Sequence, residues 1–351
     1  MITFPMSQIE ADAAHMCENV EDVVLPLDKI QMNAITGKER DEVILRPTHG
    51  HFHESGNEYT LSDTALNGML YRLDWARKFW DHIPKKGLRA TRNNLADRLL
   101  ERNHQDVLVR SKDNFIFGMN SPYYERINHD FVTQMLLDNE VMSDFDIVGY
   151  RSDYDFFSIR AISKNNFNEV GDVGLGFIIS NSMSGLRALE IKMFVFVLAC
   201  SNGMIIPQTA VGKMVRRIHK GGRMEYGKQN APTYAGEKFH EIRSEVAAQI
   251  RFARSEELAR MTSDTIQQAK ETAVEKDAQR ERIRNTLKLS ETEKKLYNEA
   301  LDLNIRDHGQ NVWGWVQAAT WMAHRPPFEG TLRQEELEMA AWRVLERAPQ
   351  L

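Results

Sequence analysis

The sequence predicts an α+β fold: a mostly antiparallel sheet with helices packed on it, and a long helical C-terminal region. Three observations predict this fold. Apolar residues repeat every three or four positions from Thr60 onward, which indicates helices. The period changes to two between Asp144 and Pro207, which indicates strands. Beyond it, Thr233 to about Leu287 contains no proline and one glycine, which favours long helices.

The first 59 residues are expected to form an irregular lead that contains short strands. Two segments rich in β-branched residues, Glu21–Ile30 and Glu42–Arg46, are the candidate strands. Thr36 and Gly37 lie between them and are typical of a turn. The lead therefore predicts at least one small strand pair before the first long helix.

A helical block is expected after this lead. Thr60 with Asp63 three positions on resembles a capping box, so a helix is predicted to begin there. Its buried face is expected to hold Leu66, Met69, Leu70, Leu73 and Ala76. A further helix is predicted over Thr91–Arg102. One side of that helix carries Leu95, Leu99 and Leu100.

The β-rich block forms the centre of a predicted core domain over residues 60–232. A hairpin over Val107–Arg110 and Asn114–Gly118 and a short helix over His129–Asp138 precede it. Strands are then predicted near Ile147 and Tyr150, over Phe156–Ile162, over Gly174–Ser180, over Leu189–Met193 and over Met193–Cys200. The last is apolar on both faces, which is typical of a central strand covered on both sides.

Two helical regions are predicted after the core domain. Residues 233–289 are expected to form one long charged helix or a helix pair, because acidic and basic residues alternate along them. Residues 290–351 form the C-terminal region, which begins with a capping box at Ser290 and Glu293. Its last two helices are predicted over Trp313–Met322 and Leu332–Arg347, separated by Arg325-Pro326-Pro327.

Composition narrows the class of protein. The 351 residues are 42% hydrophobic and 27% charged, which is typical of a folded globular chain. The longest apolar run, Met193–Cys200, is too short to span a bilayer, and Met1–Glu10 lacks the pattern of a signal peptide. Two cysteines, Cys17 and Cys200, make no disulfide framework. We therefore expect a cytoplasmic protein with no membrane partner.

Local charge is the strongest pointer to a function. The chain has a net charge of −5, yet residues 211–230 hold six basic residues and one acidic residue. Because phosphate neutralisation needs several cations on one surface, this basic segment predicts contacts with nucleic acid. The expected contacts are Lys213, Arg216, Arg217, His219, Lys220, Arg223 and Lys228. Their spacing would let a helix align them, and Tyr226 is placed to stack on a base.

Polar residues at two ends of the β-rich block complete the expected interface. Asn181 and Ser182 follow one predicted strand, and Asn202 with Gly203 follows another. Asn and Ser form hydrogen-bonded turns, and Asn-Gly is a strong turn signal. Two loops at the same edge of the sheet are the structural interpretation. The functional one places Asn181, Ser182 and Asn202 at the mouth of a nucleic-acid groove.

Several short stretches carry a resemblance across roughly residues 60–345. The most specific is Asn181-Ser182-Met183-Ser184-Gly185 leading to Cys200-Ser201-Asn202-Gly203-Met204. The others are Leu61–Leu66 leading to Ile83-Pro84, Val109-Arg110 followed by Ser121 and Tyr124, Arg217 with His219, and Trp313–Ala319. Together they resemble a family of phage and plasmid proteins of unknown function, which implies a mobile-element origin, a bacterial host cell and an α+β fold. The chain is also distantly similar, at fold level, to phage single-strand annealing proteins of the RecT and ERF kind.

A metal-dependent nuclease is the enzymatic alternative. Glu190 and Lys192 share one face of a predicted strand, and Asp172 lies upstream. Two carboxylates can hold Mg²⁺ while a lysine steadies the attacking water. Other candidate metal ligands are the pairs Asp144 with Asp146 and Asp153 with Asp155, and the alternating His49, His51 and His53. Turns collect aspartate for structural reasons, and the histidines lie in a polar loop.

The expected function is therefore binding of single-stranded DNA or another nucleic acid in the DNA metabolism of a phage or plasmid, including ATP-independent strand annealing. Gly171–Gly176 lacks the lysine and hydroxyl of a nucleotide-binding loop, so no cofactor is expected. The long charged helices make a homo-oligomer the expected assembly. A third alternative is an interaction protein that counteracts a host defence complex.

Overall fold

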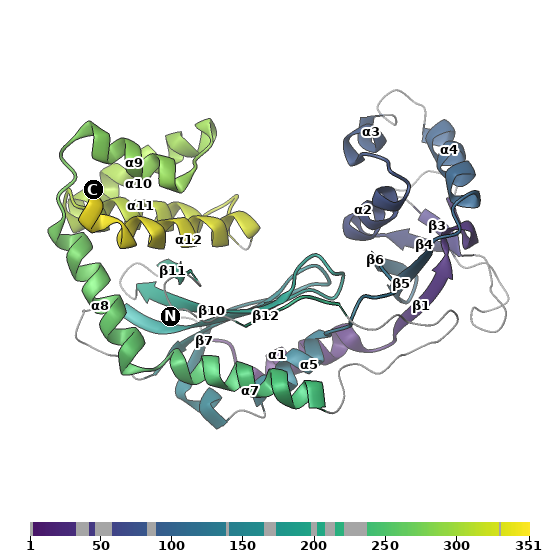
Figure 1. Ribbon diagram of the computed structural model, residues 1–351, viewed down its shortest axis with the longest axis horizontal. Helices are drawn as coiled ribbons and strands as arrows, with labels where there is room; N and C mark the ends of the chain where they lie inside the picture. Colours follow the sequence, from purple (N-terminus) through teal and green to yellow (C-terminus); the bar gives the residue numbers. More distant parts are fainter. Residues whose placement is uncertain are drawn as a thin grey trace.

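The computed structural model describes residues 3–32, 42–45, 58–82, 89–137, 140–164, 173–197, 202–207, 215–220, 237–329 and 331–351. It contains two six-stranded sheets and helices packed on both, so the predicted α+β class is confirmed. Figure 1 shows three parts in a U shape: an N-terminal lobe, a central sheet, and a C-terminal helical lobe. The two lobes stand on the same side of the central sheet.

The N-terminal lobe is a sheet with helices on one face. Its strands are β1 (Val20–Pro26), β2 (Ile30–Met32), β3 (Glu42–Leu45), β4 (Glu58–Leu61), β5 (Asp106–Lys112) and β6 (Phe115–Asn120), in the order β1-β5-β6-β4-β3-β2. Its helices are α2 (Asp63–Arg72), α3 (Arg77–His82) and α4 (Arg89–Glu101). The strands of the predicted hairpin pair as β5 and β6. Trp80 is fully buried in the core of this lobe.

Two details of the helical block differ from the sequence expectation. Ser62, not Thr60, caps α2, because its Oγ accepts the N–H of Ala65 at 2.9 Å. The expected apolar side of α4 is also divided: Leu100 is buried, whereas Leu95 and Leu99 are exposed. The buried apolar face of this helix is therefore formed by Leu100 and by Ala96, four positions before it.

The first residues form a helix where an irregular lead was expected. This helix, α1 (Met6–Cys17), buries Ile9 and Ala13 and packs with α5 (His129–Leu137) beneath the central sheet. Residues four apart share one helical face, but two small or medium apolar residues make a weak periodic signal. Pro5 precedes the helix without a side-chain cap, so the usual start signal is also missing.

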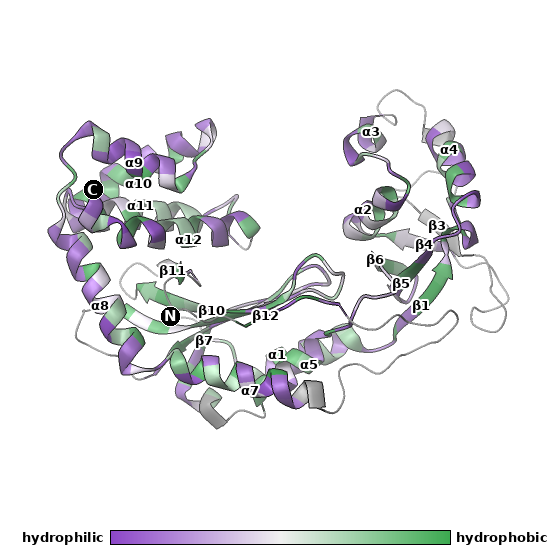
Figure 2. Ribbon diagram, in the orientation of Figure 1, coloured by the Kyte–Doolittle hydropathy of each residue, from purple (hydrophilic) through white to green (hydrophobic). Residues whose placement is uncertain are grey.

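The central sheet has the strand order β11-β10-β9-β8-β7, with β12 also paired to β10. Its strands are β7 (Phe145–Ser152), β8 (Phe157–Ser163), β9 (Val173–Asn181), β10 (Leu189–Val197), β11 (Asn202–Ile206) and β12 (Val215–Arg217). All pairs are antiparallel. The lower face buries alternate residues such as Phe177 and Ile179 in the main core with α1 and α5. Figure 2 shows how apolar residues concentrate in these strands.

The described part of the chain from residue 237 onward is built from helices. Its helices are α7 (Glu237–Phe252), α8 (Glu256–Glu271), α9 (Asp277–Leu287), α10 (Glu291–His308), α11 (Val312–Ala323) and α12 (Leu332–Glu346). Where one long helix or a pair was expected, three helices form, because Ser255 caps a new one. The capping box at Ser290 and Glu293 is confirmed. None of the helices in the described ranges is long and apolar enough to cross a membrane.

A buried ion cluster fixes the N-terminal lobe against the central sheet. Arg110 of β5 is fully buried and donates to Asp22 of β1 at 2.6 Å and to the backbone oxygen of Met183 at 2.5 Å. Arg126 donates to the second oxygen of Asp22 at 2.9 Å. Because Met183 follows strand β9 of the central sheet, the lobe and the sheet are held in one arrangement.

Candidate nucleic-acid interface

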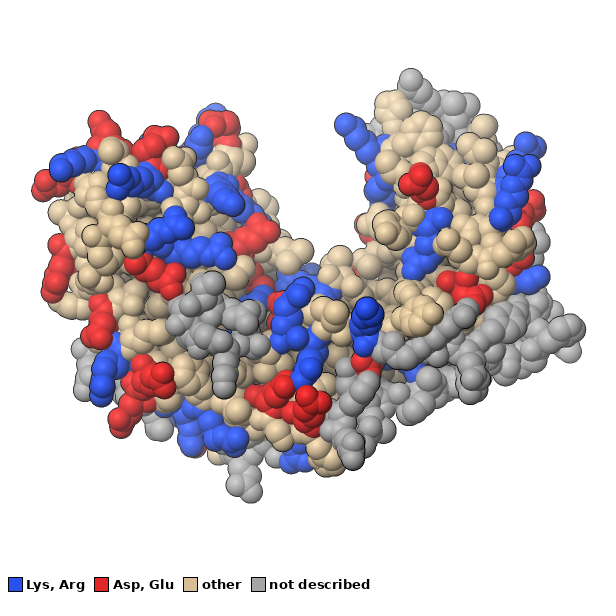
Figure 3. All heavy atoms as spheres, in the orientation of Figure 1, with Lys and Arg blue, Asp and Glu red and all other residues tan. Residues whose placement is uncertain are grey.

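The hollow between the two lobes is the largest concave feature of the view in Figure 3. Lys and Arg side chains lie at its base. The face of the central sheet that forms this base is called the upper face here. The part of this face formed by β10 and β11 is covered by α12, whose Met339 packs against Phe194, Phe196 and Ile205. On the rest of the upper face, the exposed charged side chains lie on strands β7 and β12, whereas Ser158 and Ser180 between them are buried.

Strand register brings five residues into one row across the upper face, called the polar row. The row contains Arg151, Ser158, Ser180, Glu190 and Arg216, each directly opposite the next on adjacent strands. Neighbouring strands lie about 4.8 Å apart, so the row is about 19 Å long. An arginine therefore stands at each end of a line of small and polar side chains.

Beside the polar row, ion pairs join the sheet to α12. The Nζ of Lys192 lies 2.9 Å from Glu190 and 2.8 Å from Glu335. Arg187 lies 2.8 Å from the other oxygen of Glu335, and Arg160 lies 2.7 Å from Glu338. Burial lowers the pKa of Lys192, but the carboxylates of Glu335 and Glu190 outweigh burial and raise it overall. Lys192 is therefore a fixed cation that holds α12 on the sheet.

The two ends of the polar row are its exposed cations. The side chain of Arg151 is 46% exposed and pairs with Asp153, and that of Arg216 is 58% exposed and pairs with Glu190. Ion pairs at such exposed positions contribute only about 0–1 kcal/mol. A phosphate group can therefore take the place of Asp153 beside Arg151 at small cost, whereas Glu190 beside Arg216 is only 18% exposed and also pairs with Lys192.

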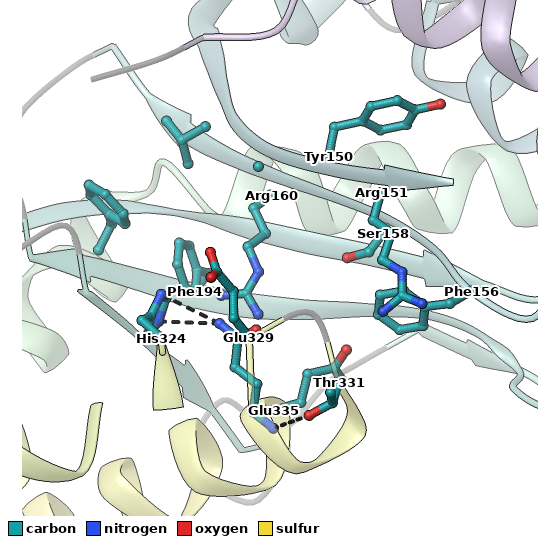
Figure 4. Close-up of a pocket in the computed structure, with 14 residues that line it drawn as sticks. Tyr150, Arg151, Phe156, Ser158, Arg160, Phe194, His324, Glu329, Thr331 and Glu335 are labelled. Atoms are coloured by element: carbon teal, nitrogen blue, oxygen red, sulfur yellow. Dashed lines mark hydrogen bonds between the residues drawn. The ribbon is translucent and has the colours of Figure 1, made fainter. Parts of the chain in front are cut away.

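A cleft of about 690 Å³ opens beside the row, between the upper face and the segment that leads into α12. Figure 4 shows Arg151, Phe156, Arg160 and Phe194 on the sheet side. His324, Glu329, Thr331 and Glu335 lie on the helical side. Arg151 lies over the ring of Phe156, 4.9 Å from its centroid, and Arg160 lies over Phe194 at 5.3 Å. The cleft thus combines cations with aromatic rings.

The structure separates the two arginines of the basic segment. Residues 215–217 form a strand, not the expected helix, so Arg216 and Arg217 point to opposite faces. Arg217 turns away from the polar row and pairs with Glu241 and Glu245 of α7. Because α7 lies under the sheet (Figure 1), the side chain of Arg217 belongs to the lower side.

The remaining members of the basic segment have varied surroundings. His219 stacks on Tyr124 with ring centroids 4.8 Å apart, and its Nδ1 lies 2.8 Å from the backbone oxygen of Glu125. Burial lowers the pKa of His219 to about 4, so it is neutral near pH 7. Lys220 is exposed. Lys213, Arg223, Tyr226 and Lys228 lie outside the described residues.

The asparagine and serine residues hold backbone in place. Asn181 is fully buried and donates to the backbone oxygen of Ile127 at 2.7 Å. The Oγ of Ser182 is buried and accepts the N–H groups of Gly185 and Leu186. Ser182 therefore organises the loop between β9 and β10, and Asn181 holds the segment before α5 against β9.

Asn202 and Gly203 are part of β11, where a tight turn was expected. Asn202 lies opposite Val197 of β10, and Gly203 lies opposite Phe196. The glycine is required by packing, because a Cβ at this position would lie 2.2 Å from the ring of Phe194. The Asn-Gly signal therefore marks a close approach of backbone to an aromatic ring.

The structure describes two of the three residues of the nuclease alternative. Glu190 and Lys192 share the upper face, as predicted, and Asp172 lies outside the described residues. Burial raises the pKa of Glu190, but Lys192 and Arg216 outweigh burial and lower it overall. Across the described ranges, no group of three or more His, Cys, Asp and Glu residues lies where it could hold a metal ion.

Among the other candidate metal ligands, those that the structure describes make turn hydrogen bonds or an ion pair. The Oδ1 of Asp153 accepts the N–H groups of Asp155 and Phe156, which makes the turn between β7 and β8. Asp144 pairs with Arg254 of the segment after α7. His49, His51 and His53 lie outside the described residues.

Sequence reasoning predicted Arg216 but missed the other arginines of the upper face, Arg151, Arg160 and Arg187, and the acidic residues of α12 that pair with the sheet. Arg160 and Glu338 are 178 positions apart, and Lys192 and Glu335 are 143 apart. No local pattern links residues at such distances. One signal was present: Ser158 and Arg160 alternate with apolar residues in β8, which places a charge on one face of an inner strand.

Comparison with known proteins gives one match. The family described as "Domain of unknown function (DUF932)" matches residues 154–343, more than half of the chain. The matched region runs from the turn before β8 into α12, so it includes most of the polar row and the helical wall of the cleft. No curated protein and no solved structure matches the chain.

Proposed function

We propose that this chain, which belongs to the DUF932 family, binds single-stranded nucleic acid across the upper face of its central sheet. The observation that carries the proposal is the polar row, which has exposed arginines, Arg151 and Arg216, at its two ends. Phosphate contacts supply most of the sequence-independent affinity of such proteins. The two arginines are the first residues that we expect to make them.

The mixture of cations and rings favours a single strand over a duplex. Proteins that bind single strands combine a cationic groove with aromatic platforms on which bases stack. Phe156 lies beneath Arg151 in the cleft, whereas the ring of Tyr150 packs against Phe157 on the lower face. A duplex keeps its bases stacked on one another and would use the arginines alone.

Within this proposal, the protein acts in the DNA metabolism of a phage or plasmid and promotes annealing of complementary strands. The resemblance to phage and plasmid proteins, and the distant similarity to single-strand annealing proteins, support this finer assignment. Annealing needs no nucleotide hydrolysis, because base pairing supplies the free energy. The protein would neutralise the phosphates and hold the bases accessible.

Fluorescence anisotropy of labelled single-stranded DNA at several salt concentrations tests the proposal. We expect affinity to fall as salt rises, with a slope of about −0.7 per phosphate contact. Replacing both Arg151 and Arg216 by alanine should reduce that slope by about 1.4. The charge-matched control replaces Arg280 and Lys294, partly exposed cations of α9 and α10. Absence of binding at low salt, or equal slopes for the two double variants, would overturn the proposal.

A metal-dependent nuclease is the second candidate, because Glu190 and Lys192 do share one face of β10. Incubation of DNA with the protein and Mg²⁺ or Mn²⁺ distinguishes it from binding alone. Cleavage that disappears in Glu190→Gln would establish the nuclease. Intact DNA in both samples would leave binding as the activity of this face.

A further inference from the structure

We propose that the cleft beside the polar row binds one nucleotide unit of the strand, with its base unstacked and its phosphate near the start of α12. The inference rests on the proposed function, since it adds a specific subsite to the same face. Most of the residues that it concerns lie outside the polar row, while Arg151 and Ser158 belong to both.

The cleft has the size and place of a ligand site. Its volume of about 690 Å³ lies within the roughly 300–1,000 Å³ typical of pockets for small molecules. Strand β7 is the edge of the sheet on this side, so the cleft is reached from the side as well as from the hollow. Arg151 belongs to both the cleft and the polar row, which makes the two continuous.

The sheet side of the cleft is suited to an aromatic base. Both Arg151 and Arg187 lie over Phe156, at 4.9 and 4.1 Å from the ring centroid. Arg187 is held there by Glu335, so Phe156 has a fixed cation beside it. A planar guanidinium stacks on one ring and can stack on another. The exposed guanidinium of Arg151 therefore offers a base a ready platform.

The helical side is suited to a phosphate. Thr331 caps α12, and its Oγ accepts the N–H of Gln334. The other N–H groups of the first turn have no partner within the helix and, with the helix dipole, attract anions. Glu335 lies on the same turn, but its charge is balanced by Lys192 and Arg187. The positive end of α12 thus faces a cleft whose opposite wall carries Arg151 and Arg160.

Glu329 adds a preference among bases. It is exposed at the opening of the cleft. A carboxylate accepts a hydrogen bond from the exocyclic amino group of cytosine, whereas thymine has no such group. We therefore expect a cytosine nucleotide to bind more tightly than a thymine nucleotide.

Isothermal titration with deoxycytidine and thymidine 5′-monophosphates tests the inference directly. We expect deoxycytidine monophosphate to bind the wild-type chain and to bind more weakly to Glu329→Gln, while thymidine monophosphate binds both equally. Val148→Trp places a large ring in the cleft and should abolish nucleotide binding. It should also weaken binding of a cytosine oligonucleotide by roughly 5- to 150-fold, the contribution of one stacked base.

The outcomes separate this inference from the proposed function. If the oligonucleotide binds but neither nucleotide binds, and Val148→Trp leaves oligonucleotide affinity unchanged, the cleft is not a nucleotide site and the polar row alone explains binding. If nucleotides bind but the oligonucleotide does not, the proposed function is wrong and the inference that the cleft is a nucleotide site is supported. If neither binds, both fail. Equal thermal unfolding of Glu329→Gln and the wild type confirms that the exposed substitution leaves the fold intact.

Discussion

Glu335 is the residue whose loss should most change the attachment of α12 to the sheet. Its side chain is 4% exposed and accepts hydrogen bonds from Lys192 and Arg187, each at 2.8 Å. In Glu335→Gln the shape is kept but the charge is lost. Arg187 would then have no carboxylate partner, and its Nε and Nη2 already lack partners among the described residues.

The magnitude follows from these contacts. Removing one partner of a buried ion pair costs about 3–5 kcal/mol, because the other charge stays buried without compensation. Lys192 keeps Glu190, which limits the cost on that side. We therefore expect a loss of about 4 kcal/mol in the free energy of unfolding, or roughly a thousandfold in the equilibrium constant.

Urea unfolding followed by circular dichroism measures this change. The matched control is Glu336→Gln, the same substitution one position along α12, where the side chain is 56% exposed and pairs with Arg333. The control should lose less than about 1 kcal/mol. A Glu335→Gln variant within 1 kcal/mol of the wild type would refute the view that this pair anchors α12.

Three further predictions concern other parts of the molecule. Burial raises the pKa of Asp22, but Arg110 and Arg126 outweigh burial and lower it overall. The stabilising effect of Asp22 should therefore be full above about pH 4 and decline as the pH falls through its folded pKa. In urea unfolding, the difference in free energy of unfolding between the wild type and Asp22→Asn should shrink in acid. Gly203→Ala should cost about 1–3 kcal/mol in calorimetry, because its Cβ would overlap an aromatic ring; an unchanged midpoint would contradict this. Arg216→Ala should lower the salt slope for single-stranded DNA by about 0.7, whereas Arg217→Ala should leave it unchanged, and equal effects would show that both arginines meet the strand.

Much of the fold follows from local patterns. The alternation in residues 144–207 predicted strands β7 to β10 of the central sheet, and the capping box at Ser290 predicted the start of α10. Local patterns failed where the signal was weak, as in α1, where Ile9 and Ala13 alone mark the buried face. They also failed at Asn202, where a residue pair typical of turns serves close packing in a strand.

The candidate site was less accessible to sequence reasoning than the fold. Spacing of three or four in the basic segment suggested that a helix aligns its cations, but strand pairing with β10 places Arg216 and Arg217 on opposite faces. The polar row depends on the register of five strands, which local composition does not specify. The cleft also depends on the placement of α12 over the sheet.

The most direct test of nucleic-acid binding on the upper face is to map where a strand lies. Single-stranded DNA containing photoreactive thymine would be cross-linked to the protein, and the modified peptides would be identified by mass spectrometry. We expect cross-links in β7, β8 and residues 215–220, which carry Arg151, Ser158 and Arg216. Cross-links confined to the outer helices α9 and α10, or none at a concentration where the strand is bound, would contradict the account.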